Sequence, residues 1–349
     1  MPGPSRDSAS EARPTLEAVA ARAGVSRATA SRVVNGGAGV RKPLAEQVRR
    51  AVAELGYVPN HAARTLVTRR NGAVAVIVDE PESRLFSDPF FSRQIRGISR
   101  ELTFHDSQLV LLLVEGRGDF DRVARYLAGG HVDGVLAFSL HTDGGLPAVI
   151  HRFRVPTVYG GRPGRPGEDP GPGAPYVDCD NRGGAAAAVR HLVSLGRRRI
   201  AHIAGPRDQT SALDRIDGYR DVLPDADPAL VADGDFTAEG GARAMAELLD
   251  RAPGLDAVFA ANDLMASGAL RVLRERGRTV PDAVALVGFD DMGSIAEATD
   301  PPLTTVRQDV EGMGRLMVRM LMERLSGDGG DEGPRSVVTP TELVRRASA

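Results

Sequence analysis

The stretch TLEAVAARAGVSRATASRVVNG, residues 15–36, has the pattern of two short helices joined by a tight turn. Ala20, Gly24 and Ala30 have the spacing of a helix-turn-helix, since small residues let the helices approach and a glycine takes the turn. In such a unit the second helix lies in the major groove of DNA and presents its N-terminal side chains to base edges. Three-helix packing modules that do not bind DNA have the same spacing, so that alternative stays open here.

Capping residues predict where the helices of this segment begin and end. Thr15 and Ser26 can each accept a hydrogen bond from the first turn of the helix that follows. Pro43 suits the first turn of a third helix, and Gly56 is suited to end it. We therefore predict an all-α helix-turn-helix DNA-binding domain over residues 14–59.

Side chains suited to DNA gather on and around the second helix. Arginine pairs bidentately with guanine, asparagine pairs with adenine, and alanine or threonine can meet a thymine methyl group. A basic residue before the third helix is expected to add a phosphate contact. The candidate DNA-binding residues of this domain are Thr15, Ser26, Arg27, Ala28, Thr29, Ser31, Arg32, Asn35 and Arg41.

Charge is unevenly distributed along the chain. Residues 1–72 hold 12 Arg or Lys against 5 Asp or Glu, although the whole chain of 349 residues has a net charge of -2. A basic head on an acidic body favours contact with a polyanion, and a basic solvated surface is the alternative. Residues 1–13 are small and polar, and we expect a disordered leader there.

From Ala73 the pattern changes to alternating strands and helices. Apolar runs such as AVAVIV (73–78) and QLVLLLV (108–114) alternate with amphipathic helices, which is typical of a parallel sheet covered by helices. A loop rich in glycine and proline (160–175) separates two similar series, each too short for a barrel. The expected fold class is an all-α head joined to an α/β core of two doubly wound parallel-sheet subdomains, like that of periplasmic binding proteins.

The effector-binding and dimerisation core is predicted to occupy residues 73–346. We expect the chain to cross between its subdomains near 160–176, 303–310 and 335. The run SVVTPTELVRR, residues 336–346, is expected to form one closing strand.

Catalytic and metal-binding patterns are missing from the sequence. There is no GxSxG, HExxH or P-loop motif, and the seven histidines are scattered. The single cysteine, Cys179, has no Cys or His cluster around it, so no disulfide within the chain and no zinc site are expected. Without a catalytic motif, we expect a protein that is not an enzyme. With no secretory signal and no stretch of transmembrane length, we expect it in the cytoplasm.

The head and core together resemble the lactose-repressor (LacI/GalR) family of transcription regulators. The resemblance covers nearly the whole chain. It is carried by TLEAVAARAGVSRATASRVVNG with ELGYVPNHAARTL, and by DPFFSRQIRGI, VDGVLAF, LVSLGRRRIAHIAGP, AANDLMASGALRVLRERG and VPDAVALVGFDD. It implies a homodimeric repressor that binds a pseudo-palindromic operator in double-stranded DNA and responds to a small-molecule effector, with no other cofactor.

The resemblance gives residues 60–72 the role of a hinge helix and linker. In the family, two hinge helices pack in the minor groove and insert a pair of leucines, and an apolar wedge of that kind kinks DNA. Leu66 matches that leucine, while Asn60 and Ala63 belong to the same hinge. From chemistry alone, Leu66 would be a surface residue of a linker.

The resemblance also implies an effector site between the two subdomains, where open α/β sheets bind ligands. The resemblance implies a small polar effector, usually a sugar or a nucleobase. Carboxylates, amides and a guanidinium suit a ligand rich in hydroxyl groups, most simply a sugar, and the phenylalanines could face a sugar or a purine ring. Structural alternatives are that Asp263 and Asp290 cap turns, that Arg215 only pairs with them, and that one phenylalanine is core. Asp178 and Cys179 are interpreted as structural. The candidate effector-binding residues are Phe90, Phe91, Ser139, Arg162, Arg215, Asn262, Asp263, Asp290 and Gln308.

Two rival functions belong to other classes. A solute-binding receptor for transport would share the core, but the basic head and the missing export signal argue against it. A sugar-processing enzyme is disfavoured by the missing catalytic motifs.

Overall fold

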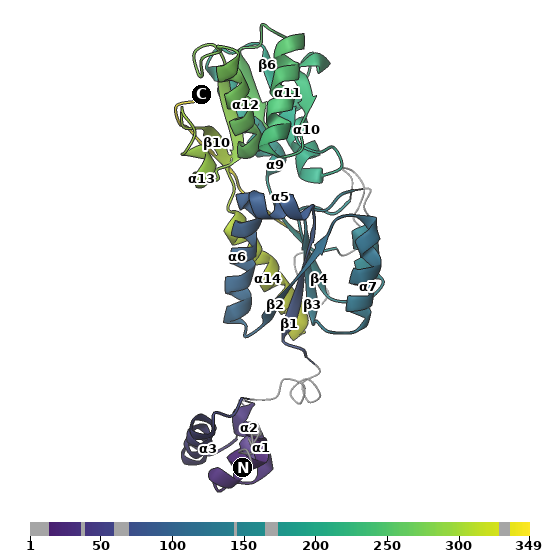
Figure 1. Ribbon diagram of the computed structural model, residues 1–349, viewed down its shortest axis with the longest axis vertical. Coiled ribbons are helices and arrows are strands. Elements are labelled where there is room, and N and C mark those ends of the chain that lie inside the picture. Colours follow the sequence, from purple (N-terminus) through teal and green to yellow (C-terminus); the bar gives the residue numbers. More distant parts are fainter. Residues whose placement is uncertain (1–13, 36–38, 59–69, 143–144, 165–173, 328–335) are drawn as a thin grey trace, which may run out of the picture. The chain divides into compact units, whose positions relative to one another are not determined.

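The computed structural model divides into two compact units, residues 1–71 and 72–349, which are described separately. The ribbon of each unit can be followed in Figure 1. The described residues are 14–35, 39–58, 70–142, 145–164, 174–327 and 336–349.

The first unit is a three-helix head. Its helices are α1 (Leu16–Arg22), α2 (Arg27–Val34) and α3 (Lys42–Leu55). Both predicted caps are confirmed, because Thr15 Oγ1 accepts from Ala18 N and Ser26 Oγ accepts from Thr29 N, each at 3.2 Å. The three helices share a small core whose buried members are Val19, Ala20, Ala30, Val48 and Ala51.

Two six-stranded sheets form the second unit, in the orders β11-β5-β4-β3-β1-β2 and β12-β10-β9-β8-β6-β7. The first sheet contains β1 (Ala73–Asp79), β2 (Gln108–Val114), β3 (Gly134–Phe138), β4 (Thr157–Gly160), β5 (Tyr176–Cys179) and β11 (Ser336–Thr339). The second contains β6 (Ile200–Ala204), β7 (Val231–Asp233), β8 (Ala257–Ala260), β9 (Ala285–Asp290), β10 (Thr304–Arg307) and β12 (Glu342–Val344). Every described pairing is parallel except that of β10 with β12, so the predicted fold class is confirmed.

Helices cover both faces of each sheet. Around the first sheet lie α5 (Glu82–Ser87), α6 (Pro89–Phe104), α7 (Phe120–Ala128), α8 (Leu146–His151) and α14 (Val310–Ser326). Around the second lie α9 (Asn181–Ser194), α10 (Thr210–Val222), α11 (Ala238–Arg251), α12 (Asp263–Glu275) and the short α13 (Gly293–Ala296). In β1, Val76 joins the core that includes α6 and α14, while Ile77 joins the core that includes α7 and α8. Strands buried on both faces therefore read as continuous apolar runs.

The chain crosses between the sheets three times, and two crossings differ from the prediction. It leaves the first sheet after Cys179, returns between Arg307 and Val310, and crosses again between Thr339 and Glu342. The predicted crossing near 160–176 is wrong because β5 follows that segment and still belongs to the first sheet. Glycine and proline there mark a connection within one subdomain. The crossing predicted near 335 comes a few residues later, because β11 also belongs to the first sheet.

The run 336–346 forms two strands, so the expectation of a single closing strand is wrong. β11 pairs with β5 of the first sheet, and β12 pairs with β10 of the second. Pro340 lies between them. Because proline has no backbone N–H to donate to a sheet, it is a natural place for a strand to end.

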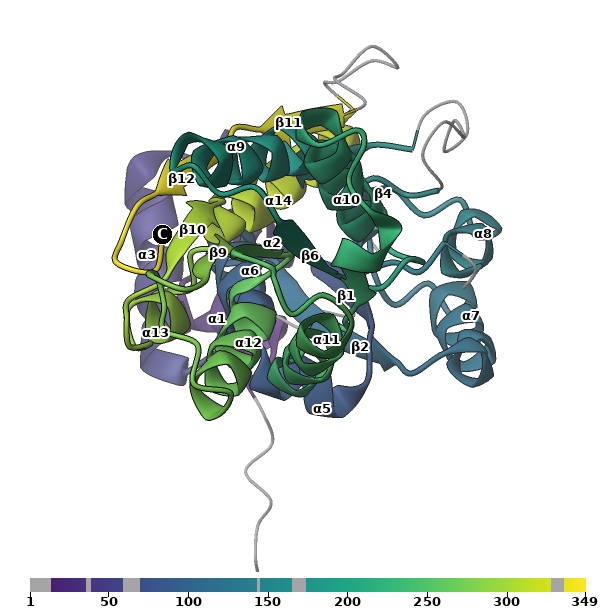
Figure 2. The ribbon, with the colours of Figure 1, turned by 90° about the horizontal axis from the view of Figure 1, so that it is seen from above.

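Two glycines permit the close packing of α11 against α12, which lie side by side in Figure 2. A Cβ atom at Gly268 would overlap the carbonyl oxygen of Ala238, and one at Gly241 would overlap that of Met265. These obstacles are backbone atoms, which cannot turn away as a flexible side chain can.

We predict that Gly268→Ala lowers the free energy of unfolding by about 1–3 kcal/mol, because the added methyl group forces the two helices apart. Chemical denaturation measures the change. Gly118→Ala is the matched control, since a Cβ there meets no heavy atom within 4 Å. Equal stability of the two variants would contradict the packing argument.

Candidate functional site

A cavity lies between the two sheets of the core. Its lining includes residues at or just after the carboxyl ends of strands, such as Ser139 after β3, Gly161 after β4, Asn262 after β8 and Asp290 at the end of β9. Parallel strands place their carboxyl ends at one edge of a sheet, and ligands of open α/β sheets bind there. The cavity is therefore where the topology favours a ligand site.

Most of the predicted effector residues line this cavity, and one does not. Those that line it are Phe90, Phe91, Ser139, Arg162, Arg215, Asn262, Asp290 and Gln308. Asp263 is 1% exposed and lies outside the lining. Its carboxylate accepts hydrogen bonds from Thr305 Oγ1 (2.6 Å) and Met292 N (2.8 Å). These bonds connect the start of α12 to its neighbours, so Asp263 is corrected to a structural residue.

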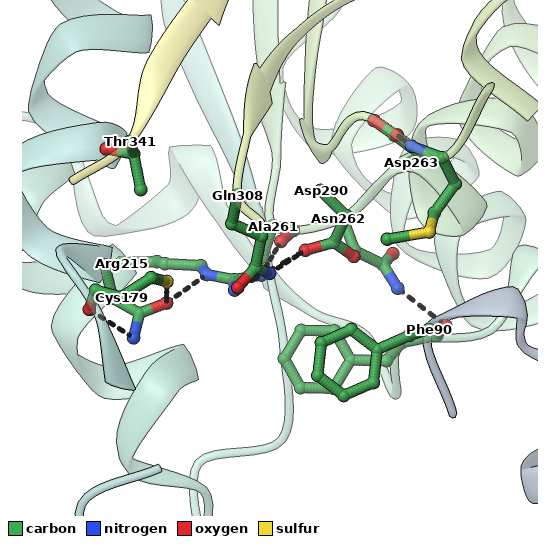
Figure 3. Close-up of polar contacts among 12 residues, drawn as sticks. Phe90, Cys179, Arg215, Ala261, Asn262, Asp263, Asp290, Gln308 and Thr341 are labelled. Atoms are coloured by element: carbon green, nitrogen blue, oxygen red, sulfur yellow. Dashed lines mark hydrogen bonds and ion pairs between the residues drawn. The ribbon is translucent and has the colours of Figure 1, made fainter. Parts of the chain in front are cut away.

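The guanidinium of Arg215 is the centre of the polar network in Figure 3. Its Nε donates to Asn181 Oδ1 at 2.9 Å, and its Nη1 donates to the carbonyl oxygen of Ala261. Its Nη2 lies 3.6 Å from Asp290 Oδ1, and its Cζ lies 3.7 Å from the ring centre of Phe289. A buried cation needs such partners because removal from water costs it several kcal/mol.

Asp290 combines an unusual backbone with an unusual acidity. Its φ is +104°, in a region that side-chain-bearing residues rarely adopt and that typically costs about 1–3 kcal/mol. Burial raises the pKa of Asp290 to about 7, and the Arg215 guanidinium limits that rise. Gln308 Nε2 donates to Asp290 Oδ1 at 2.6 Å. Near neutral pH this carboxyl group can thus either donate or accept a hydrogen bond, as a hydroxyl group also can.

Asn262 is a cap as well as a lining residue. Its Oδ1 accepts from Met265 N at 2.8 Å, and its Nδ2 donates to the carbonyl oxygen of Phe236 at 3.0 Å. The amide is thus held rigidly at the start of α12.

Aromatic rings form the apolar part of the lining. Phe91 is 1% exposed and stacks on Phe138 with their ring centres 6.3 Å apart. Phe90 is half-buried and meets Phe91 edge-on at 5.5 Å. Phe91 is therefore the core member of the pair. The ring of Phe236 from the second subdomain also lines the cavity.

Several lining residues were missed from the sequence. Asp178 and Cys179 line the cavity as well as serving structure, because β5 ends there. Asn181 joins Asp178 to Arg215, donating from Nδ2 to Asp178 Oδ1 at 2.9 Å. The only signal in the sequence for Asn181 was its place just after the apolar strand β5. That strand is hard to recognise because it directly follows the loop rich in glycine and proline (160–175). The other missed polar residues are Arg84, Asp88, Gln94, Gln209, Thr210 and Ser211.

Polar contacts tie the two subdomains together across the cavity. Arg162 Nη2 lies 2.7 Å and 2.9 Å from the two carboxylate oxygens of Asp214 on α10. Gln209 Nε2 donates to Glu80 Oε1 of the first subdomain at 2.7 Å. Within the first subdomain, Ser139 Oγ donates to the same oxygen. The contacts of Arg162 and Gln209 thus connect the two subdomains in the arrangement seen here.

His141 belongs to the same set of contacts. Its Nδ1 lies 2.6 Å from Asp208 Oδ2 of the other subdomain, and its Nε2 lies 3.6 Å from Glu80 Oε1. Glu80 and then Asp208 raise the pKa of His141 to about 9, although burial opposes the rise. The imidazolium is therefore the form present at neutral pH, where it connects two carboxylates.

In the head, α2 presents several of the predicted DNA-binding side chains. Arg27, Ala28, Arg32 and Asn35 are exposed, whereas Thr29 is half-buried.

Two of these residues have partners within the head. Arg27 Nε lies 2.7 Å from Glu17 Oε1, and Asn35 Nδ2 donates to Ser31 Oγ, itself half-buried, at 3.2 Å. Exposed Arg41 precedes α3 and makes no side-chain cap bond among the described residues.

The predicted hinge residues Asn60, Ala63 and Leu66 lie outside the described residues. Within the described ranges, no group of His, Cys, Asp and Glu side chains has the arrangement of a metal site. No helix in that same part of the chain is long and apolar enough to span a membrane.

A helix-turn-helix head joined to a two-sheet core with a polar cavity is the architecture of ligand-responsive regulators. Residues 15–60 match the model of bacterial regulatory proteins of the lacI family, and residues 189–349 match the periplasmic binding protein-like domain. HTH-type transcriptional regulator CelR of Thermobifida fusca is 50% identical over 341 residues, covering 96% of this chain and 98% of that protein. The ribose operon repressor of Halalkalibacterium halodurans is 30% identical over 337 residues, covering 95% and 96%.

Solved structures agree with this assignment. The CelR–cellobiose complex matches with a TM-score of 0.76 and 47% identity, covering 97% of this chain and all (100%) of that one. The lac repressor dimer bound to operator and the anti-inducer ONPF matches with a TM-score of 0.82 and 28% identity, covering 97% and 99%. This chain belongs to the lacI family of bacterial regulatory proteins. It is a transcriptional regulator and not an enzyme, which confirms the predicted family and class.

The raised pKa of His141 predicts a pH-dependent contribution to the stability of the core. Because its pKa of about 9 exceeds the ordinary value of 6.5, the stabilisation is fully present below pH 6.5 and is lost as pH rises through 9. His141→Gln should therefore melt a few degrees below wild type at about pH 6, and this difference should shrink by about pH 9.5. Exposed His151→Gln is the control. A difference that stays constant over this range would show that the charge of His141 contributes nothing.

Proposed function

We propose that this regulator is a homodimeric, sequence-specific DNA-binding repressor whose operator affinity is controlled by a small polar effector, most simply a sugar. The observation that carries the proposal is the cavity itself. It sets a guanidinium, carboxyl groups and amides around aromatic rings, inside a core joined to a helix-turn-helix head. The cellobiose bound by the CelR structure supports a carbohydrate effector.

The sugar assignment follows from the balance of groups in the cavity. The cationic side chains in the lining have anionic partners, as Arg215 has Asp290, Arg162 has Asp214, and Arg84 has Glu80. A neutral ligand is thus favoured over an ionic one. Hydroxyl groups would bond the fixed amides and Asp290, and the apolar face of a ring would lie against Phe90. The proposed effector contacts are Phe90, Phe91, Ser139, Arg162, Arg215, Asn262, Asp290 and Gln308.

DNA binding is assigned to the head and hinge, residues 14–59 and 60–72. The exposed residues of α2, among them Arg27 and Arg32, are proposed to read bases in the major groove. The helix starts at Thr15 and Ser26, together with Arg41, would meet phosphates. Thr29, Ala28, Ser31 and Asn35 complete the proposed recognition helix contacts, and Asn60, Ala63 and Leu66 complete the hinge contacts. The operator-bound dimer of the lac repressor supports a two-fold symmetric, pseudo-palindromic site.

Control by the effector requires that it bind one arrangement of the core better than another. Closure of the two subdomains around the ligand would then change how the paired heads meet the operator. The place of action is the cytoplasm, with the protein associated with the nucleoid.

Operator binding tests the first half of the proposal. Fluorescence anisotropy with the promoter region of the protein's own gene should show affinity falling steeply as salt rises, because phosphate contacts release counterions. Leu66→Ala should weaken binding at every salt concentration without changing that slope, since leucine carries no charge. Effector affinity should stay the same. Leu195→Ala, an exposed leucine of the core, is the control. Unchanged operator affinity in Leu66→Ala would remove the wedge, and salt-independent binding would remove the proposed interface.

Asp290→Asn tests the effector half. A thermal-shift panel of cellobiose, other disaccharides, monosaccharides and nucleobases first identifies a ligand, because binding raises apparent stability. Calorimetric titration should then show affinity reduced about tenfold to 100-fold in Asp290→Asn, since hydrogen bonds to charged groups contribute about 1.5–3 kcal/mol. Asp250→Asn, on the outer helix α11, is the matched control. Wild-type affinity in Asp290→Asn would exclude this residue from ligand contact.

A further inference from the structure

Gln94 places a buried amide in the cavity with almost nothing to bond to. The residue lies on α6, lines the cavity and is 3% exposed. Its Nε2 lies 3.3 Å from Met317 Sδ, a thioether that is only a weak acceptor. Its Oε1 has no hydrogen-bond partner among the described residues. Whichever way the amide is turned, one polar atom has no protein partner and the other faces only sulfur.

The surroundings of this amide are apolar, and the absence of a side chain at Gly160 leaves space for it. A Cβ atom at Gly160, the last residue of β4, would lie 2.9 Å from Gln94 Nε2, 2.8 Å from Phe138 Cβ and 3.0 Å from Met317 Sδ. The φ of Gly160 is not in the left-handed region, so its backbone conformation does not require glycine. What requires glycine at this position is the lack of space for a side chain. Any larger residue at that strand end would displace the amide.

Other amides of the cavity have hydrogen-bond partners in the protein, whereas the Oε1 atom of Gln94 has none among the described residues. Gln308 donates to Asp290, while Asn262 accepts from Met265 N and donates to the carbonyl oxygen of Phe236. The buried Nε of Arg84 shares the condition of Gln94, since it too has no partner in the described structure. A leucine or methionine at position 94 would fill the same space without the cost of an unpaired buried polar group.

We propose that Gln94 is a specificity-determining residue of the effector site, and that its amide hydrogen-bonds a hydroxyl group of the bound carbohydrate. The assignment rests on the proposed function. A hydroxyl group satisfies the amide in either orientation because it both donates and accepts. An alkyl or aryl group placed there would leave the amide unpaired, so the site selects a hydroxylated ring at this position over an apolar aglycone.

Calorimetric titration of the full-length protein tests the assignment. Wild type and Gln94→Leu are titrated with cellobiose, glucose, maltose and ribose, and with monodeoxy derivatives of whichever sugar binds. Gln94→Leu should bind the parent sugar about tenfold more weakly. For one monodeoxy derivative, wild type and variant should bind equally, because the lost hydroxyl is the partner of Gln94. Without ligand, Gln94→Leu should melt at or above the wild-type temperature.

Controls separate the possible failures. Exposed Gln108→Leu should bind every sugar as wild type does. Gln94→Met, closer in shape, repeats the test if Gln94→Leu does not fold. Wild-type affinity in both Gln94 variants, or the same loss for every deoxy derivative, overturns the assignment alone. A wild-type protein that binds none of the four sugars overturns the sugar effector, and the role of Gln94 with it.

Discussion

The core is organised around a buried positive charge. The guanidinium of Arg215 would be costly in an apolar interior, and it is tolerated because groups from three segments reach it. Asn181 comes from the start of α9, the Ala261 carbonyl from the end of β8, and Asp290 from the end of β9. Each is fixed by its own secondary structure, so the strand ends of the second sheet converge on one point. The ring of Phe289 covers the planar face of the guanidinium.

Charge also defines how the first subdomain meets the second. Arg162 and His141 each reach a carboxylate on the opposite side, at Asp214 and Asp208. These contacts are only partly buried, so each is weaker than an enclosed pair and can be exchanged for water. Contacts of this kind permit the two subdomains to change their arrangement, which the proposed control by an effector requires. The deeply buried pair of Arg215 and Asp290, by contrast, is a fixed part of the cavity wall.

Features that depend on neighbouring residues in the chain could be predicted from the sequence, whereas features that depend on distant residues could not. The caps at Thr15 and Ser26 depend on hydrogen bonds to residues three positions later, so the local sequence was sufficient to predict them. Asp263 and Asp290 both stand near the ends of apolar strands, yet only Asp290 lines the cavity. The carboxylate of Asp263 is instead held by Thr305 and Met292, which are distant in sequence, and no local pattern reveals these partners. Gln94 escaped notice because a polar residue on an amphipathic helix is ordinarily exposed. Its amide packs against the glycine at position 160, which is distant in sequence.

The three crossings between the sheets lie together. β5 and β11, which lead into two of them, are neighbours in the first sheet, while β10 and β12 are neighbours in the second. The covalent connections are thus gathered along one line and are only a few residues long. Such an arrangement favours rotation of one half against the other about these connections. A ligand that draws the cavity walls together would therefore turn one whole half against the other. The far surfaces of each half then move by an amount set by their distance from that line, with no need for a chain of altered contacts between them.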